Sequence, residues 1–188
     1  MMRLYSPARA SKILGRHAAW IQTVSQRYGI PQALIKAILF QEMTMIDLMD
    51  PLADLAVRTG IFKKKDSSTG YGQVFGRTGV IAVNYAVDHG LETYESLGVC
   101  TDHRLDEENL QDVRLVWRLL NGNPEANIQI CALNLLVAAD EVVGRTDFES
   151  FSDEEYKLVC TRYNANRRQV TPYGERAFRR FRAFQRAE

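Results

Sequence analysis

A glutamate on the apolar face of a predicted helix is the side chain best placed for acid chemistry. Glu42 follows Ile35 and Ile38 by seven and four positions, so helical spacing puts its side chain among theirs. Burial disfavours the ionised form of a carboxyl and raises its pKa, so a buried glutamate can stay protonated near neutral pH and donate a proton to a leaving oxygen. The alternative is a structural role, in which Glu42 pairs with an arginine or a tyrosine in the core.

A loop downstream of Glu42 carries further side chains that could contact a ligand. Residues 68–73 have the sequence Ser-Thr-Gly-Tyr-Gly-Gln, and glycines allow close approach of the backbone and φ values above zero. Gln73 offers an amide donor and acceptor, and Tyr71 could stack on a sugar face. By themselves, the two glycines predict only a turn.

The order of four motifs resembles that of the lysozyme-like fold of lytic transglycosylases and goose-type lysozymes. The motifs are Gln41-Glu42, the loop at 70–73, Asn127-Ile128 on a helix and Tyr163-Asn164, and the resemblance spans roughly residues 20–180. It implies that Glu42 is the single essential acid, that the loop lines a glycan cleft and that Tyr163 lies near the acid. The substrate-binding residues expected from the resemblance are Ser68, Gly70, Tyr71, Gln73, Asn127, Tyr163 and Asn164.

The reaction implied by the resemblance is cleavage of the β-1,4 bond between N-acetylmuramic acid and N-acetylglucosamine in peptidoglycan, without a metal ion or another cofactor. A lytic transglycosylase works with one acid. Glu42 would protonate the glycosidic oxygen and then remove the proton of the sugar's own 6-hydroxyl, which closes a 1,6-anhydro ring. The chain departs from the family at Met43, where serine is usual, and at Tyr71-Gly72, which replaces Leu-Met.

A second carboxylate would be needed by a hydrolase that inverts the sugar's configuration, roughly 6.5–9.5 Å from the acid. Asp66 is the candidate, because goose-type lysozymes have an acidic residue at the same step before a Gly-aromatic-Gly sequence. That alignment conflicts with the one that places Gly70 on the first glycine of the family's Gly-Leu-Met-Gln loop, so both cannot hold. The alternative is that Asp66 pairs in solvent with the lysines at 63–65.

Helical patterns around these residues predict an all-α fold in a single domain over residues 1–188, with at most a minor β-hairpin, and the resemblance implies that this fold is lysozyme-like. We expect helices over residues 8–28, 31–42, 50–57, 78–89, 107–120, 128–143 and 152–162 and from 171 onward, with caps, prolines and glycines at their ends. The helix begun by Asn123-Pro124 is apolar around its circumference, which is typical of a central, buried helix. Residues 58–75 lack a helical period and predict a loop with a short hairpin. Residues from about 91 to 122 are expected to be a helical insertion relative to the simplest family members.

Composition favours one soluble globular domain. Apolar residues make up 46% of the chain and charged residues 25%, no stretch approaches the length of a membrane span, and no secretory signal is recognisable. Cys100, Cys131 and Cys160 are odd in number and lack metal-type spacing, so we expect neither disulfides nor a metal site.

The expected location is the cytoplasm until export to the cell wall by a secretion machine or a holin. The candidate protein partners are such a secretion machine, a holin or an inhibitor protein.

Basic residues gather at the two ends of the chain. Residues 1–30 carry five basic and no acidic groups, and residues 162–188 carry eight arginines and two acids. Basic ends attract polyanions such as nucleic acid, anionic wall polymers or lipid headgroups, or they simply keep helix surfaces hydrated. Two rivals to glycan cleavage follow: a non-catalytic wall-binding or assembly module on the same fold, and a helical nucleic-acid binder. The second is disfavoured because residues 162–186 have no stacking motif and no recognisable reading helix.

Overall fold

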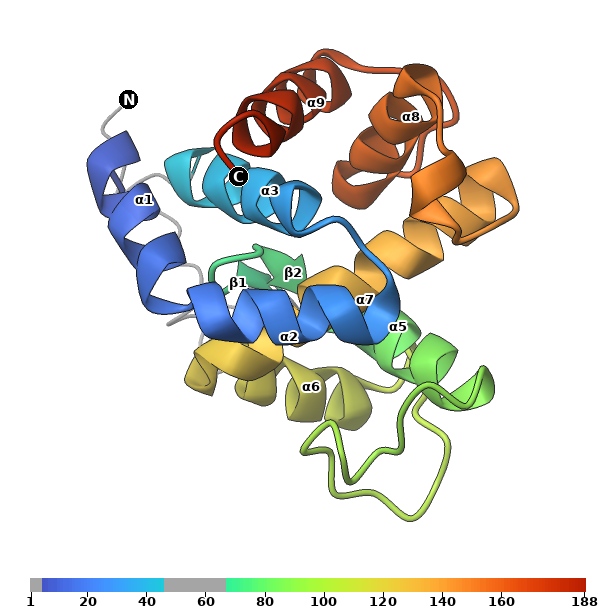
Figure 1. Ribbon diagram of the computed structural model, residues 1–188. Coiled ribbons are helices and arrows are strands. Elements are labelled where there is room, and N and C mark those ends of the chain that lie inside the picture. The colour runs from blue at the N-terminus through green and yellow to red at the C-terminus, as the bar shows by residue number, and fades with distance from the viewer. Residues whose placement is uncertain (1–4, 46–66) are drawn as a thin grey trace.

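Helices make up most of the structure, a computed structural model that describes residues 5–45 and 67–188 (Figure 1). In chain order, the elements are α1 (Pro7–Arg16), α2 (Ala18–Tyr28), α3 (Gln32–Met45), β1 (Ser68–Thr69), β2 (Val74–Phe75), α5 (Gly76–Asp88), α6 (Leu110–Gly122), α7 (Pro124–Val143), a 3₁₀ turn (Phe148–Ser150), α8 (Asp153–Asn164) and α9 (Pro172–Gln185). The predicted fold class, all-α with a minor hairpin, is confirmed. The helix predicted over residues 50–57 lies outside the described residues.

α7 is the central helix of the fold. All of its residues from Ala126 to Ala139 are buried, and α2, α5, α6 and α8 pack around it (Figure 1). The side chain of Asn123 caps its start, and Gly144 ends it with a φ of 77°. By length and composition alone, α7 could cross a membrane, so the prediction that no stretch approaches the length of a membrane span is wrong. However, 78% of this stretch is buried inside the protein, so the core that it forms accounts for its apolar character.

The first predicted helix, over residues 8–28, is in fact two helices. The backbone of His17 leaves the helical region at φ −102° and ψ 13°, so α1 ends there and α2 starts in a new direction (Figure 1). α1 packs against α3, whereas α2 packs mainly against α7. Because the two apolar faces cover different partners, one straight helix could not bury both, and the prediction of a single helix is wrong.

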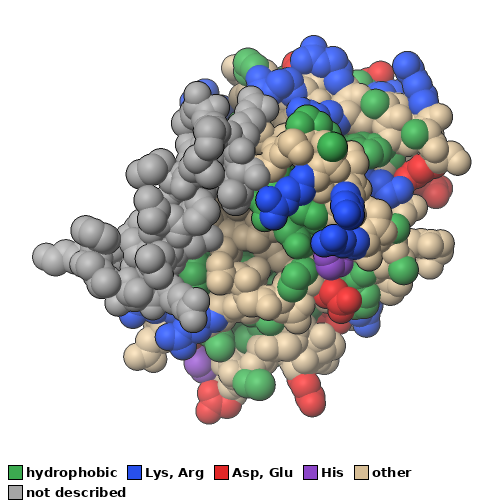
Figure 2. All heavy atoms as spheres, turned by 90° about the vertical axis from the view of Figure 1, so that its left-hand side faces the viewer, with side chains coloured by type: hydrophobic (Ala, Val, Ile, Leu, Met, Phe, Trp, Pro, Cys, Tyr) green, Lys and Arg blue, Asp and Glu red, His purple; other side chains and the backbone are tan. Residues whose placement is uncertain are grey.

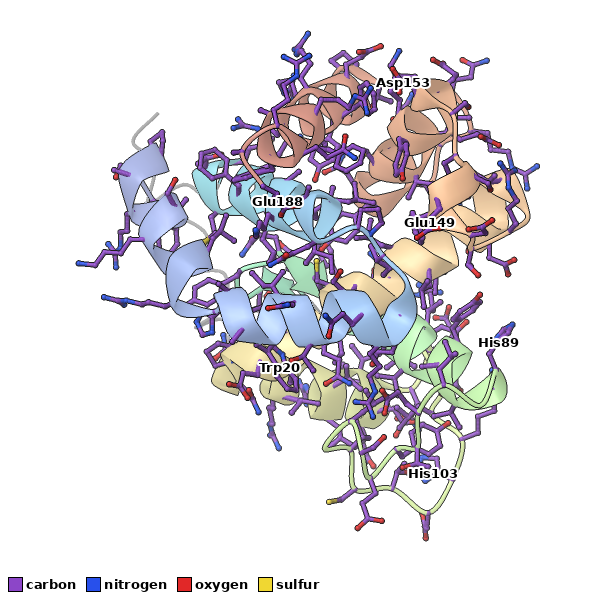
Figure 3. The ribbon with its side chains drawn as sticks, viewed as in Figure 1. Trp20, His89, His103, Glu149, Asp153 and Glu188 are labelled. Carbon is purple, nitrogen blue, oxygen red and sulfur yellow. The ribbon has the colours of Figure 1, made fainter. Side chains whose placement is uncertain are left out.

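α3, α8 and α9 pack together on one side of α7 (Figure 1). Ser152 and Glu155 form a capping box at the start of α8: the Ser152 hydroxyl accepts from the backbone N–H of Glu155, whose carboxylate accepts from the Ser152 N–H at 2.8 Å. Thr171 caps α9, as its position before a proline predicted. Glu188 returns over α3, where its carboxylate accepts from Lys36 Nζ at 2.8 Å (Figure 3). The two ends of the described chain are therefore held to the same helix, since α1 also packs on α3.

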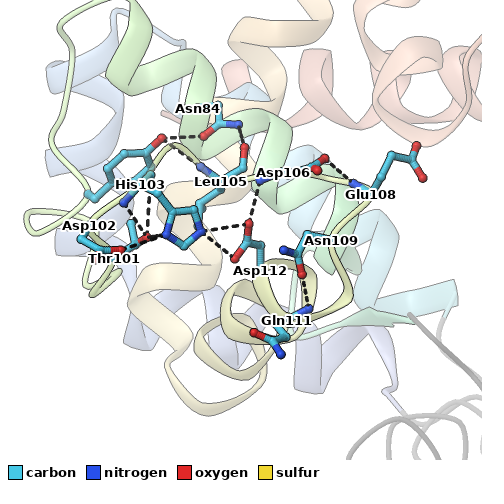
Figure 4. Close-up of polar contacts among 11 residues, drawn as sticks. Asn84, Thr101, Asp102, His103, Leu105, Asp106, Glu108, Asn109, Gln111 and Asp112 are labelled. Carbon is cyan, nitrogen blue, oxygen red and sulfur yellow. Dashed lines mark hydrogen bonds and ion pairs between the residues drawn. The ribbon is translucent and has the colours of Figure 1, made fainter.

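α5 and α6 pack against each other on the other side of α7, and residues 89–109 connect them without helix or strand (Figure 1). Polar contacts hold this connection to the core. The buried carboxylate of Glu92 accepts from the Tyr28 hydroxyl at 2.6 Å. Further along, Asn84 Nδ2 donates to the carbonyl of Leu105 at 2.8 Å (Figure 4). α6 begins and ends two to three residues later than the helix predicted over 107–120.

Several of the basic residues near the ends of the chain lie on the outer faces of helices. Arg9, Lys12 and Arg16 are exposed on α1, which has no acidic residue, and Arg176 and Arg179 are exposed on α9. Figure 2 faces α1 and shows lysine and arginine side chains over it and above it, where α9 lies. These charges are therefore available to solvent or to an anionic surface.

Candidate active site

Glu42 lies in the last turn of α3 and is 9% exposed. Leu34, Ile35 and Ile38 on the same helix are fully buried, as the helical spacing predicted. Burial raises the pKa of Glu42 from its ordinary value of 4.5 to about 7, and a hydrogen bond from the Tyr173 hydroxyl opposes part of that rise. Glu42 therefore carries a proton on a substantial fraction of molecules at neutral pH, which is the requirement for a general acid.

Tyr173, from the first turn of α9, fixes the orientation of the Glu42 carboxyl. Its hydroxyl donates to Oε1 of Glu42, which leaves Oε2 to hold the proton. Its carbonyl accepts from Gln41 Nε2 at 3.1 Å, and Arg180 Nε in turn donates to Gln41 Oε1 at 2.9 Å. Two neighbouring residues of α3 thus bind the same tyrosine at both ends, so the position of the acid depends on the docking of α9 onto α3.

Tyr163 lies near the acid, as the resemblance implied, because it lines the cleft with Glu42, but the tyrosine that is hydrogen-bonded to the carboxyl is Tyr173, which the sequence did not indicate. The Tyr163 hydroxyl instead donates to the carbonyl of Gly72 at 2.6 Å and lies 3.2 Å from Cys131 Sγ. Tyr173 shares one helix face with Ala177 and Phe181, at intervals of four residues, and all three are buried. That spacing after the Thr-Pro start of the helix could have identified a buried tyrosine, but it does not indicate which residue the hydroxyl contacts.

A cleft of about 370 Å³ opens beside Glu42. Parts of α3, the hairpin, α5, α7 and α8 line it: Glu42, Met45, Ser68, Gln73, Val74, Phe75, Thr78, Asn134, Arg162, Tyr163, Asn164, Ala165 and Asn166. Amide and hydroxyl side chains predominate among these polar residues. Within the described lining, Glu42 is the single acidic residue, and the one basic residue, Arg162, pairs with Glu141 of α7. The cleft is therefore built for a ligand with many hydrogen-bonding groups rather than for a cation.

The hairpin places Ser68 and Gln73 in the cleft, as predicted. Gln73 Nε2 donates to the carbonyl of Gly70 at 2.9 Å, and the Ser68 hydroxyl donates to Gln73 Oε1 at 3.1 Å. Gln73 itself has a φ of 45°, a region that side chains other than glycine rarely adopt. Both the nitrogen and the oxygen of the Gln73 side-chain amide are therefore hydrogen-bonded within the hairpin, which fixes the orientation of this amide in the cleft.

Asn127, at the start of α7, supports the hairpin from inside. Its side chain is 0% exposed; Oδ1 accepts from the Gly72 N–H at 2.8 Å and Nδ2 donates to the Thr69 carbonyl at 3.0 Å. Gly70 has a φ of 72°, and a Cβ at this position would lie 2.0 Å from Asn127 Nδ2. Glycine is therefore required here by both the backbone conformation and the close approach of the amide.

Three of the predicted substrate contacts are replaced by structural roles. Gly70 and Asn127 form the turn and its support, and neither lines the cleft. Tyr71 also lies outside the cleft lining, because its ring packs against the ring of His17, with centroids 5.6 Å apart. Ser68, Gln73, Tyr163 and Asn164 do line the cleft with Glu42, and Asp66 lies outside the described residues.

The sequence did not point to several of the residues that line the cleft, but the spacing of one of them, Asn134, could have indicated it. Asn134 lies seven positions after Asn127 and three after Cys131, so the three residues share one face of α7. That face meets the hairpin and the cleft, since Cys131 contacts Tyr163 and Asn134 lines the cleft. Polar residues at helical spacing on an otherwise apolar helix could have predicted Asn134. The other cleft residues missed by the sequence analysis are Met45, Val74, Phe75, Thr78, Arg162, Ala165 and Asn166.

The cysteines behave as small apolar side chains where they are buried. Cys131 and Cys160 are 0% exposed, and burial raises the pKa of each thiol to about 12. Cys100 is exposed, and all three are free thiols. Within residues 5–45 and 67–188, no cluster of three or more histidine, cysteine, aspartate or glutamate side chains could hold a metal ion.

Comparison with known protein families, curated proteins and solved structures finds no match to this chain. The resemblance to lytic transglycosylases therefore stays a prediction from its motifs. The case for a function rests on the site itself: a buried glutamate with a raised pKa, a tyrosine that orients it and a polar cleft beside it.

Proposed function

We propose that this protein cleaves glycan strands of peptidoglycan at the β-1,4 bond between N-acetylmuramic acid and N-acetylglucosamine, with Glu42 as the general acid. The observation that carries the proposal is a glutamate whose pKa is about 7 at the wall of an open cleft. A glycosidic oxygen is a poor leaving group until it is protonated, and a protonated glutamate in an apolar setting is the usual donor.

The lining of the cleft supports a glycan as the ligand. Sugars present hydroxyls and N-acetyl amides, and the described lining offers matching groups from Ser68, Gln73 and three asparagines. A volume of about 370 Å³ lies within the range of specific small-ligand sites. The choice of peptidoglycan among glycans rests on the motif order described above.

The proposed step needs one carboxyl group. As the bond between C1 and the glycosidic oxygen breaks, the proton on Glu42 moves to that oxygen, and the carboxylate that remains keeps the hydrogen bond from Tyr173. Glu42 then accepts a proton from the sugar's 6-hydroxyl, which attacks C1 and closes the anhydro ring. Glu42 is the single carboxylate in the described lining, and this intramolecular route needs no second one.

The test is digestion of purified peptidoglycan followed by mass spectrometry of the released fragments. We expect an anhydro product, one water lighter than the product of hydrolysis, and a rate that falls as pH rises through about 7, because Glu42 then loses its proton. Glu42→Gln should lower the rate by roughly 10²–10⁴, the range attributed to general acid catalysis.

Glu149→Gln is the matched control, because Glu149 is an exposed glutamate on the outer surface (Figure 3). It should keep the full rate. Cleavage that survives Glu42→Gln would refute the proposal. Binding of glycan strands by the unaltered protein without release of any fragment would instead favour the non-catalytic wall-binding module.

A further inference from the structure

Exposed apolar side chains gather at the cleft. Within the described residues, three large apolar side chains are exposed: Met45 at 47%, Phe75 at 48% and Leu91 at 41%. Met45 and Phe75 both line the cleft with Glu42, whereas Leu91 does not. Apolar groups that stay in water beside a polar cleft indicate a surface that a ligand covers.

The hairpin sets the direction of Phe75. Side chains alternate along a strand, so Phe75 points away from its neighbour Val74: both contribute to the cleft lining, but Val74 is 2% exposed and Phe75 is 48% exposed. Gln73, in the turn just before the strand, lines the cleft as well. Phe75 pairs with Ser68 across the hairpin, and Ser68 also lines the cleft. An aromatic ring therefore stands next to a hydroxyl and an amide on the same cleft-facing surface.

A pyranose ring matches this combination of groups. Its ring face carries C–H bonds and is apolar, while its edge carries hydroxyl or amide groups that need donors and acceptors. Aromatic rings provide a flat apolar surface for such a face, and the flexible thioether of Met45 can adapt to the shape of a neighbouring group. Ser68 and Gln73 are bonded to each other and to the turn, but the second N–H of the Gln73 amide and the acceptor oxygen of Ser68 can still bind a polar ligand, and a purely apolar ligand would leave that capacity unused.

We propose that Phe75 is a binding subsite for one sugar ring of the substrate, on whose apolar face the phenyl ring stacks. The subsite rests on the proposed function, since it needs a glycan in the cleft. It replaces Tyr71, the aromatic residue that the sequence pointed to, whose ring packs on His17 instead.

Binding of chitotetraose, a soluble β-1,4 tetramer of N-acetylglucosamine, tests the subsite by calorimetry. The parent protein carries Glu42→Gln, so that the ligand is not cleaved. Phe75→Ala in this background should weaken binding by about tenfold, the size expected for loss of an aromatic contact. Phe75→Trp should bind at least as tightly as the parent. Leu91→Ala is the control, because it removes an exposed apolar side chain outside the cleft and should bind like the parent.

A second readout follows the ring itself. The tryptophan introduced by Phe75→Trp should shift its fluorescence to shorter wavelength on addition of chitotetraose, because the sugar excludes water from it. Unchanged affinity of Phe75→Ala, or an equal loss with Leu91→Ala, would refute the subsite, and the proposed function would stand if the unaltered protein still cleaves peptidoglycan. If the parent binds no glycan and the unaltered protein cleaves none, the proposed function fails and the subsite fails with it.

Discussion

Glu42→Gln should make the protein more stable at alkaline pH. The pKa of Glu42 is about 7 in the folded chain and 4.5 when the side chain is in water. Because its folded pKa is raised, the stability associated with its proton is fully present below pH 4.5 and is lost as pH rises to about 7. At 1.36 kcal/mol per pKa unit, the loss is about 3 kcal/mol. Glutamine stays neutral at every pH and can still accept the hydrogen bond from Tyr173, so it avoids this loss.

Urea unfolding at pH 5 and at pH 8.5 measures the effect. The stability of Glu42→Gln relative to the unaltered protein should rise by about 2.5 kcal/mol between the two pH values, because at pH 5 part of the effect is already lost, and this corresponds to roughly 5–10 °C in melting temperature. Glu149→Gln removes an exposed carboxyl and should show no such rise. A stability difference for Glu42→Gln that does not change with pH would mean that Glu42 is ionised throughout, and the assignment of the acid would then be refuted.

Two further perturbations test the parts that position the site. Tyr173→Phe removes the hydrogen bond that lowers the pKa of Glu42, so this pKa should rise by about 0.5–1, as followed by ¹³C NMR of the labelled carboxyl. Tyr163→Phe, whose hydroxyl contacts a backbone carbonyl instead, should leave it unchanged, and an equal shift in both variants would count against the assignment. Gly70→Ala should cost at least 2 kcal/mol in urea unfolding, because its Cβ would overlap a buried amide. Gly144→Ala has a similar φ and open space around it, so its cost should be nearer 1 kcal/mol, and equal costs would refute the overlap.

The sequence predicted what depends on residues close to one another in the chain. Helical spacing placed Glu42 on a buried face, Ser152 and Thr171 marked the starts of α8 and α9, and the glycines near Gly70 marked the turn. These features follow from backbone geometry and from capping, which act over a few residues. The expectation that the acid lies beside the loop came from the resemblance in motif order, and Glu42, Ser68 and Gln73 do line one cleft.

What the sequence could not predict depends on packing between distant segments. The break at His17 arises because α1 and α2 cover different helices. The partner of Glu42 is Tyr173, 131 residues away, and nothing within either local segment indicates that pairing. Likewise, the amide of Asn127 is a group that could bind a ligand, but it is hydrogen-bonded to the backbone of the hairpin instead. Each of these features depends on which helices and loops contact one another in the folded chain.

The distance in sequence between Glu42 and Tyr173 has a consequence for how the protein folds. A contact that closes so long a loop of chain is expected to form late in folding, after the local helices. Between pH 5 and pH 6.5 the folded chain binds a proton at Glu42 that the unfolded chain mostly lacks. Refolding in a weakly buffered solution should thus take up protons from an indicator dye, and the time course of that uptake would report when α9 docks onto α3.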